Sequence, residues 1–244
     1  MSQTVERSFR LVECVARAEA PCGLVELASR ADLDKSTAAR LLAHLEERGV
    51  LKRDHASRRY SVGPALVSLG AIVTRKADLP TAARPHLDAL RDESGETVSL
   101  HIRAGDERVC VAGAESRHVV QRVLTIGEPV ALWEGPASKV IVAFLTGDDR
   151  AAVLRGAQAA GHPAHRFADQ LDAAARDGWL IAVGDRTPGV GAVCAAVFDP
   201  AGVAGSIAVA GPAERWSPAR MRAFSGRLRA ACAEISAEIG GSFP

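Results

Sequence analysis

The segment that most constrains the fold is an amphipathic stretch, residues 35–48, bounded by Asp34 and Gly49. Its apolar residues recur at the three-and-four spacing that places them on one face of a helix: Ala38, Leu41, Leu42 and Leu45. Asp34 is a typical N-cap and Gly49 a typical C-terminal stop. The first turns of the opposite face carry cations and hydroxyls: Lys35, Ser36, Thr37 and Arg40. We therefore predict a helix with a polar, cationic N-terminal end.

A cationic hairpin is predicted directly after this helix. Residues 50–53 and 59–62 are short strand-like runs, and the polar residues 54–58 join them. Five cations and a single acid, Asp54, lie between residues 48 and 59: Arg48, Lys52, Arg53, Arg58 and Arg59. Such a cluster is either a solvated surface or a surface that faces phosphate, and the helix beside it favours the second interpretation.

Two further helices are expected before residue 35. Residues 4–18 carry Val5, Phe9, Val12 and Val15 or Ala16 on one helical face, and residues 24–29 form a short second helix. Three helices followed by a basic hairpin indicate a winged helix-turn-helix, here over residues 1–63. Its third helix enters the major groove, and its wing cations hold the DNA backbone. The expected contacts to double-stranded DNA are Lys35, Ser36, Thr37, Ala39, Arg40, Arg58 and Arg59.

Residues 64–78 are predicted to form a linker helix. The segment 64–76 (PALVSLGAIVTRK) is rich in apolar residues. At the end of a small domain, such a helix exposes an apolar surface that a partner normally covers. We therefore expect Leu66, Leu69 and Ile72 to lie partly buried between two subunits. Leu79-Pro80 then marks the start of a second domain, residues 79–244.

The second domain is predicted to be of the α+β class, with a mostly antiparallel sheet and helices on its faces. The expected helices are residues 81–94, 139–145, 148–155, 168–177 and 218–239. Pro85 is expected to shift the regular part of the first of these towards its C-terminal end. The expected strands are residues 97–103, 108–114, 121–126, 179–183, 192–198 and 205–210.

Composition excludes several classes of protein. The chain carries 30 Lys+Arg against 29 Asp+Glu, so it is no polycation, and 48% hydrophobic with 24% charged residues is typical of soluble proteins. No run of eighteen apolar residues and no apolar signal segment is present, which predicts a cytoplasmic protein without membrane contact. The five cysteines are scattered and never form C-x-x-C, so neither a disulfide framework nor a zinc site is expected.

Candidate catalytic groups are sparse. Cys194 with His101 as a base is the best nucleophile pair, but no strand-to-helix elbow exposes Cys194 and no neighbouring cation in the sequence would lower its pKa. His162 and His165 have H-x-x-H spacing, yet Pro163 lies between them and no Cys or Glu cluster accompanies them. No nucleotide-binding glycine motif occurs. We therefore predict a protein that is not an enzyme and that uses neither a cofactor nor a metal.

Short motifs run through the whole chain in a characteristic order. In the N-terminal part they are residues 25–28 (VELA), 33–42 (LDKSTAARLL) and 60–63 (YSVG). In the C-terminal part they are residues 95–100 (GETVSL), 127–145, 178–179 (GW), 189–199 and 207–212 (IAVAGP). Together they resemble the IclR-type bacterial transcriptional regulators. The resemblance implies a GAF-like effector-binding domain, a homodimer or a dimer-of-dimers tetramer, and control of a metabolic operon, as a repressor or an activator, by a small-molecule effector.

The resemblance also implies where the effector binds. On the loop side, the pocket positions are Val130, Leu132, Trp133, Pro136 and Ala137. On the strand side, they are Val190, Ala192, Cys194, Ala208 and Ala210. Family members that bind small 2-oxo acids have hydroxyls in place of Ala208 and Ala210, and the loss of each hydrogen-bond partner costs about 1 to 3 kcal/mol. We therefore expect an aromatic or apolar organic acid, or an amino-acid-related metabolite.

Two residues are singled out for that effector. Trp133 offers an indole that can stack on a ring, and Arg122 a guanidinium that can meet a carboxylate. The alternatives are that Trp133 fills the core and that Arg122 faces solvent. For the protein as a whole, the alternative is a structural oligomer whose helix-turn-helix no longer contacts DNA. Intact Ser36, Thr37 and Arg40 argue against it.

Overall fold

The computed structural model describes residues 3–76, 78–162 and 164–243, and the chain divides into two units, residues 1–76 and 77–244. The linker helix clusters with the first unit, so the boundary lies at residue 77. The side chains of Ile72 and His165, and residue Pro163, lie outside the described part of the chain.

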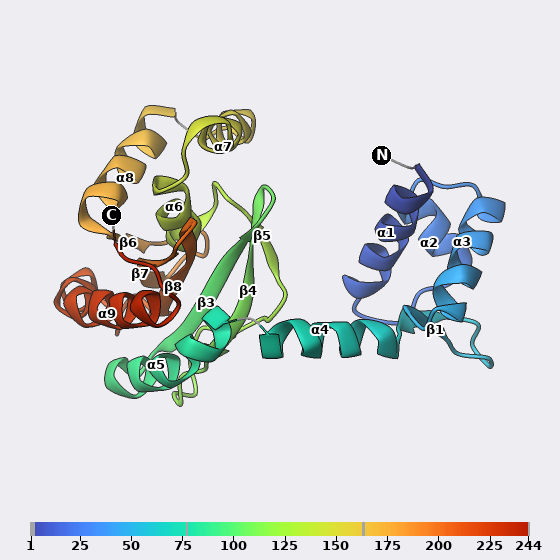
Figure 1. Ribbon diagram of the computed structural model, residues 1–244, viewed down its shortest axis with the longest axis horizontal. Helices are drawn as coiled ribbons and strands as arrows, with labels where there is room; N and C mark the ends of the chain where they lie inside the picture. The colour runs from blue at the N-terminus through green and yellow to red at the C-terminus, as the bar shows by residue number, and fades with distance from the viewer. Residues whose placement is uncertain (1–2, 77, 163, 244) are drawn as a thin grey trace. The chain divides into compact units, whose positions relative to one another are not determined.

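Unit 1 is the winged helix-turn-helix that the sequence predicts. Its elements are α1 (Gln3–Ala16), α2 (Leu24–Arg30), α3 (Lys35–Glu47), β1 (Leu51–Arg53), β2 (Tyr60–Val62) and α4 (Pro64–Lys76) (Figure 1). The first three helices and the hairpin share one apolar core: Leu11, Val15, Leu27, Leu41, Leu42, Leu51 and Tyr60. Cys22 extends the hairpin, because its backbone N–H and C=O both bond to Tyr60.

Helix α1 buries only the C-terminal part of the predicted apolar stripe. Val15 is buried in the core together with Leu11, four residues earlier, and Val12 is half-buried. Val5 and Phe9 are 50% and 65% exposed, so the prediction is wrong for the N-terminal part of the stripe. The described residues of the chain leave Val5 and Phe9 uncovered.

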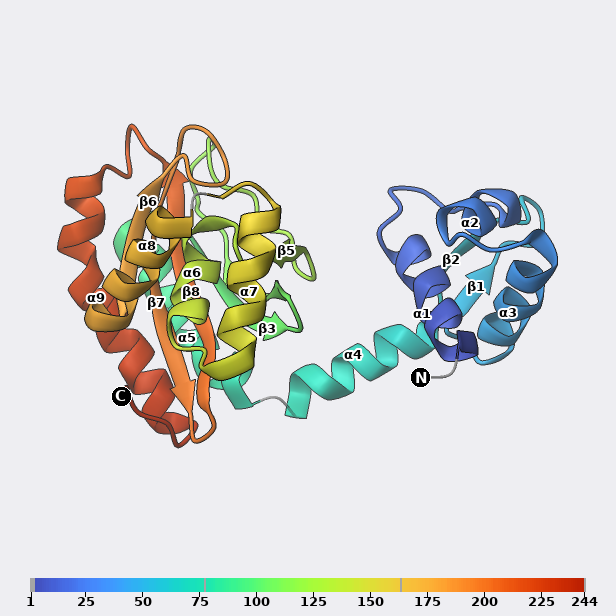
Figure 2. The ribbon, with the colours of Figure 1, turned by 90° about the horizontal axis from the view of Figure 1, so that it is seen from above.

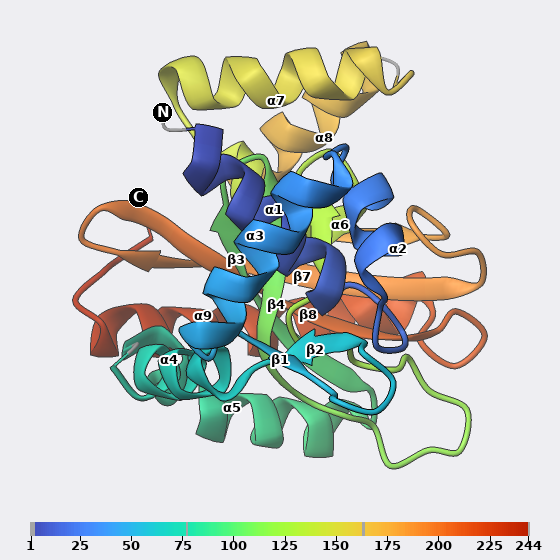
Figure 3. The same cartoon turned by 90° about the vertical axis from the view of Figure 1, so that its right-hand side faces the viewer.

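Unit 2 is an α+β domain built on a six-stranded antiparallel sheet with the order β5-β4-β3-β8-β7-β6. The strands are β3 (Thr97–Ala104), β4 (Glu107–Ala114), β5 (Pro129–Ala131), β6 (Trp179–Val183), β7 (Val190–Asp199) and β8 (Gly202–Pro212). The helices are α5 (Asp78–Ser94), α6 (Gly135–Ala143), α7 (Gly147–Ala159), α8 (Ala164–Asp177) and α9 (Pro218–Glu238). Figures 1 and 3 show α5 and α9 on one face of the sheet and α6, α7 and α8 on the other.

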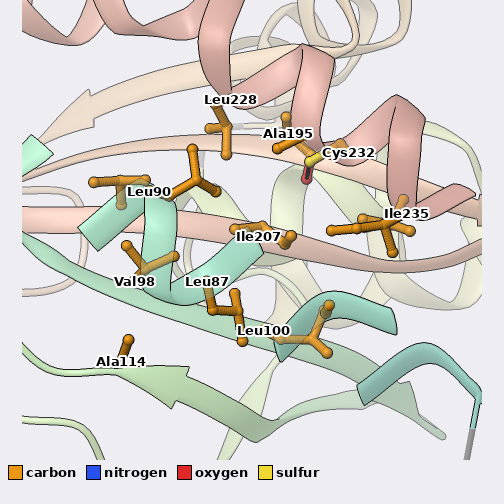
Figure 4. Close-up of a cluster of buried hydrophobic side chains, with 14 of the residues drawn as sticks. Leu87, Leu90, Val98, Leu100, Ala114, Ala195, Ile207, Leu228, Cys232 and Ile235 are labelled. Carbon is orange, nitrogen blue, oxygen red and sulfur yellow. Dashed lines mark hydrogen bonds between the residues drawn. The ribbon is translucent and has the colours of Figure 1, made fainter. Parts of the chain in front are cut away.

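The main core lies between the sheet and the layer of α5 and α9. Figure 4 shows its side chains meeting from these elements: Leu87, Leu90, Val98, Leu100, Ala195, Ile207, Leu228 and Ile235. The long hairpin of β7 and β8, seen in Figure 2, pairs from Val190 with Pro212 to Asp199 with Gly202 and carries residues for both layers. The sheet thus provides a rigid support for the residues that lie on its second face.

A β-bulge between β3 and β4 decides which side chains reach that second face. Leu100 pairs with Ala112, but the next residue, His101, pairs with Cys110, so Val111 is the extra residue. Ala112 therefore faces the main core, whereas Cys110 and Arg108 face the opposite side of the sheet. Without the bulge, the even-numbered residues of β4 would all share one face.

Two predictions for this domain are wrong. Residues 121–126 do not form a strand; the short third strand is β5, residues 129–131. Side-chain hydrogen bonds hold the segment instead: Thr97 Oγ1 donates to the Arg122 carbonyl at 2.7 Å, and the Leu124 N–H donates to Glu115 at 3.0 Å. Helix α5 also spans Asp78–Ser94 with Pro85 inside it, so Pro85 does not confine the helix to the residues that follow it.

Candidate functional site

The N-terminus of α3 is fixed by its cap. The Asp34 carboxylate accepts the Thr37 N–H at 2.8 Å and the Ser36 hydroxyl at 2.6 Å. These hydrogen bonds, from Ser36 above all, lower the pKa of Asp34. The Ser36 proton is thus engaged in capping, so the structure does not leave Ser36 as the free hydrogen-bond donor to DNA that the sequence suggested.

Exposed cations surround this capped end. Arg40 lies one turn after Ser36 on the outward face, and Lys35 and Arg40 are both exposed, whereas Thr37 and Ala39 are half-buried. No ion pair or hydrogen bond to another described residue is recorded for the side chains of Lys35 and Arg40. They are therefore free to meet an external anion.

The wing presents a further free cation. Asp54 accepts the N–H and the hydroxyl of Ser57, at 2.7 and 2.6 Å, which closes the hairpin turn. The next residue, Arg58, has a left-handed backbone with φ of 56° and an exposed side chain. Arg59 is committed elsewhere, since its Nη1 donates to the Pro21 carbonyl at 2.7 Å. Of the two predicted wing contacts, only Arg58 is therefore free.

In unit 2, a pocket opens between the second face of the sheet, the N-terminus of α6 and two connecting segments. We call residues 115–126, which connect β4 towards β5, the strap; the other segment is the loop of residues 184–189 between β6 and β7. The cavity volume is about 90 Å³, several times the space that one water molecule needs. Most of the predicted positions line it: Arg122, Pro136, Ala137, Val190, Ala192, Cys194, Ala208 and Ala210.

Three predicted positions do not line the pocket, and each has a packing reason. Val130 and Leu132 are buried, with Leu132 in the hydrophobic core of α6, α7 and α8. The Trp133 ring lies against Gly156 of α7, where a Cβ would overlap it. The Trp133 indole is thus part of the core beside α7, and the structure does not support its predicted stacking on an effector.

The wall formed by β3 and β4 is polar, which the sequence analysis missed. Arg108 and His101 are only 6% and 7% exposed, and Ser99 is 8% exposed. Arg108 Nε donates to Ser138 Oγ of α6 at 2.8 Å, and Arg108 Nη1 lies 2.7 Å from His101 Nδ1. The signal that could have revealed this wall was the Arg at the start of a strand that otherwise reads as apolar.

The geometry fixes the protonation of His101. A guanidinium only donates hydrogen bonds, so His101 Nδ1 must accept, and Nε2 carries the proton that bonds to Ser99 Oγ at 2.9 Å. Burial first, and then the charges of Arg108, Arg186 and Arg122, lower the pKa of His101 well below its usual value. The imidazole is therefore neutral, and the Ser99 hydroxyl proton is left to donate into the pocket.

The other charges at the pocket are largely paired. Lys139, whose side chain is 5% exposed, contacts both carboxylate oxygens of Asp185 at 2.7 Å. Arg186 donates to Glu128. Among the described residues, Arg108 and Arg122 have no carboxylate partner within ion-pair distance. The pocket therefore carries two uncompensated positive charges.

The cysteines of the pocket are not nucleophiles. Burial raises the pKa of Cys110 to about 11 and that of Cys194 to about 12, so both are neutral thiols near pH 7. Over the described residues, no group of three or more His, Cys, Asp or Glu side chains has the geometry to hold a metal ion. No helix within the described ranges is long and apolar enough to cross a membrane.

Known proteins match the chain over both units. The family described as IclR helix-turn-helix domain matches residues 4–55, and that described as bacterial transcriptional regulator IclR C-terminal matches residues 71–237. The HTH-type transcriptional regulator BhcR from Paracoccus denitrificans is 30% identical and covers 96% of this chain and 86% of its own. KipR from Bacillus subtilis is 27% identical and covers 89% of each chain.

Solved structures share the fold. A transcriptional regulator from Alicyclobacillus acidocaldarius superposes with a TM-score of 0.86 at 22% identity, over 98% of this chain and 100% of that chain. An IclR homolog from Microbacterium hydrocarbonoxydans, complexed with 4-hydroxybenzoate, gives a TM-score of 0.81 at 17% identity, over 97% and 99%.

The chain belongs to the IclR family of bacterial transcriptional regulators. It combines a DNA-binding helix-turn-helix with a C-terminal effector domain, as a ligand-responsive regulator. The relatives are named as regulators and repressors of transcription, so its role is regulatory and not enzymatic.

Proposed function

We propose that this protein controls a metabolic operon by binding operator DNA through α3 and the wing, and that an organic acid with an apolar body, aromatic or aliphatic, sets its activity. An amino-acid-related metabolite falls within this class. The observation that carries the proposal is the pocket, which buried, uncompensated Arg108 lines together with small apolar side chains.

On the DNA side, the free cations define the reading surface. Arg40, exposed on α3, would read a base edge, most simply a guanine, and the exposed Lys35 and Arg58 would neutralise phosphates. Thr37 and Ala39 would contact the groove through their exposed parts. Ser36 and Arg59 act within the domain, as cap partner and as a tie to Pro21.

On the effector side, the two walls favour an amphipathic anion. The apolar wall consists of side chains without hydrogen-bonding groups, apart from a buried thiol: Pro136, Ala137, Val190, Ala192, Cys194, Ala208 and Ala210. The polar wall offers donors at Arg108 and Ser99. An acid with an apolar body satisfies both, since its carboxylate meets a cation and its body displaces water from the alanines.

The protein is proposed to act as a homodimer or a dimer-of-dimers tetramer, because an operator with two half-sites needs two DNA-binding domains. Unit 1 exposes apolar side chains on two helices that a second copy would cover: Val5 and Phe9 on α1, and Val67 and Leu69 on α4. Leu66, expected between subunits, is half-buried within the chain. Light scattering that reports a monomer at micromolar concentration would contradict the oligomer.

The experiment is an anisotropy titration of the full chain with DNA from upstream of its gene and with a scrambled control. Preferential binding to the upstream DNA is expected, with log K falling against log salt by about 0.9 per phosphate contact. A thermal-shift screen of organic acids, 4-hydroxybenzoate included, is the second arm. A ligand at a hundredfold excess over its Kd should stabilise the fold by about 2.7 kcal/mol.

Ala192→Trp is the matched variant for both arms. Ala192 lies on the apolar wall, and an indole there would fill the cavity while leaving α3 untouched. The variant should lose the thermal shift and keep DNA binding. Equal binding to both DNAs at low salt would remove the regulator proposal, and an unchanged thermal shift in the variant would place the effector elsewhere.

A further inference from the structure

The proposed function requires one anionic group on the effector, but the pocket holds two unpaired cations. Arg108 is anchored on β4 beside His101, and the main chain of Arg122 is anchored by Thr97. Thr97 and His101 lie four residues apart on β3, which corresponds to about 13 Å along a strand. The anchor points of the two arginines therefore lie at opposite ends of the β3 row.

The first end of the pocket is preorganised. Ser138 fixes the Arg108 Nε, and His101, locked in its neutral form, fixes Nη1. Nη2 has no hydrogen-bond partner among the described residues, and neither does the Ser99 hydroxyl proton. Burying a cation with only neutral partners costs several kcal/mol, so this end is stabilised when an anion arrives. A carboxylate is the group that both free donors would bind.

The second end is held just as firmly. Several hydrogen bonds tie the strap, among them Arg215 Nη2 to the Val120 carbonyl, Thr97 Oγ1 to the Arg122 carbonyl, and the Leu124 N–H to Glu115. Arg215 is itself fixed by a bidentate pair with Glu96, whose side chain is 1% exposed. Arg122 thus enters the pocket from a fixed backbone and not from a loose loop.

Between the two ends, β8 contributes apolar side chains. Ala208 and Ala210 on β8 pair with Ser99 and Thr97, so their methyl groups lie along the same row. Asp185 and Glu128 also line the cavity, but Lys139 and Arg186 already compensate them. The two uncompensated charges of the pocket are therefore both positive, and uncharged side chains lie between them.

We propose, resting on the proposed function, that the effector is a dianion: an organic acid with anionic groups at both ends of a short apolar spacer, one end bound by Arg108 and Ser99 and the other by Arg122. Roughly 10 to 15 Å³ of cavity per water-sized unit suggests about six to nine non-hydrogen atoms for the enclosed part of the ligand. Dicarboxylates of four and five carbon atoms have this size, and the six-carbon diacid exceeds it by one atom.

The test compares matched acids by isothermal titration of the full chain. Succinate, glutarate and adipate are the probes, and butanoate, pentanoate and hexanoate are the one-carboxylate controls of the same length. The best diacid should bind at least tenfold more tightly than its matched monoacid. Equal affinity within each pair would overturn the dianion, and so would the absence of binding by every diacid. Specific DNA binding by the same sample would leave the regulator proposal standing in either case.

Variants assign the two ends. Arg122→Gln should weaken the diacid and so reduce the diacid-to-monoacid ratio to about one. Arg117→Gln removes the same charge from the strap, but the Arg117 side chain is 78% exposed and lies outside the pocket lining, so the ratio should stay. Ser99→Ala should weaken both acids by the same factor. A ratio that survives Arg122→Gln, or that collapses in Arg117→Gln as well, would overturn the assignment.

Discussion

Arg40 and Arg58 in unit 1 are exposed and have no ion-pair partner among the described residues, whereas Arg108 in unit 2 is 6% exposed and is held by Ser138 and His101. The same side chain thus serves two kinds of recognition. In water the charge is screened and its long side chain is mobile, which suits an extended polyanion. In the pocket the dielectric is low and the guanidinium is fixed, which suits one small anion in one pose.

The largest effect is expected where the cation is buried. Arg108→Met keeps an apolar side chain of similar length and removes the charge. Acid binding should weaken at least about thirtyfold, since losing one partner of a buried charge pair costs about 2 to 5 kcal/mol. Without ligand, the variant's free energy of unfolding should lie within about 1 kcal/mol of the wild-type value. Removing an uncompensated buried charge stabilises the fold, and this offsets the lost hydrogen bonds. Calorimetry measures the acid affinity, and urea unfolding measures the free energy of unfolding. A strongly destabilised variant would show that Arg108 is a structural residue instead.

A compensated cation beside the pocket sharpens the contrast. Asp185→Asn leaves Lys139, 5% exposed, without its carboxylate. Breaking the pair should lower the free energy of unfolding by about 3 kcal/mol, the lower end of the range for buried pairs because Asp185 is 22% exposed. Lys139→Met is the matched control and should cost less, since the remaining carboxylate reaches water. Chemical unfolding that ranks the two variants the other way would contradict this assignment.

Substitutions of the exposed Arg40 and Arg58 should differ from each other only in their effects on DNA binding. Arg40→Ala should cost about 1 to 3 kcal/mol on the operator and relax its specificity, whereas Arg58→Ala should weaken all sequences alike and reduce the salt slope by about one contact. Neither should change the thermal stability much, because exposed unpaired charges contribute little. Anisotropy with operator and scrambled DNA distinguishes the two, and the reverse pattern would exchange the reading helix and the wing.

The smallest effect concerns pH. The pKa of His101 is lowered in the folded protein, mainly by burial, while an unfolded histidine titrates near 6.5. Below about pH 6.5 the unfolded chain therefore binds more protons, so stability falls as pH falls, by at most about 1.4 kcal/mol per unit from this group, and shows no slope from it above that pH. His101→Gln keeps an acceptor for Arg108 and a donor for Ser99, and should flatten the wild-type slope between pH 6.5 and 5. An identical slope in urea unfolding would mean that His101 carries a proton in the folded state.

The same contrast explains what could be predicted from the sequence. The N-cap at Asp34, the apolar stripe of α3 and the exposed Arg40 follow from local spacing, and the structure agrees with each. Arg108 was missed because its orientation depends on the bulge at Val111, which is set by the pairing of two strands and not by β4 alone. Trp133 was misplaced because Gly156, more than twenty residues away, leaves room for its ring beside α7. Buried sites made by several elements depend on register and packing, which spacing along one element does not contain.

The most direct test of the account joins the two units in one measurement. The Kd of the full chain for its upstream DNA is measured by anisotropy with and without the best-binding diacid, in the wild type and in Arg108→Met. We expect the diacid to change the wild-type Kd at least fivefold, the usual lower range of allosteric coupling, and to leave the variant unchanged while both proteins bind DNA equally well without it. If the diacid leaves the wild-type Kd for DNA unchanged, or changes it equally in Arg108→Met, the account is contradicted. Its central claim is that acid binding at the buried arginine of unit 2 changes DNA binding by the exposed arginines of unit 1.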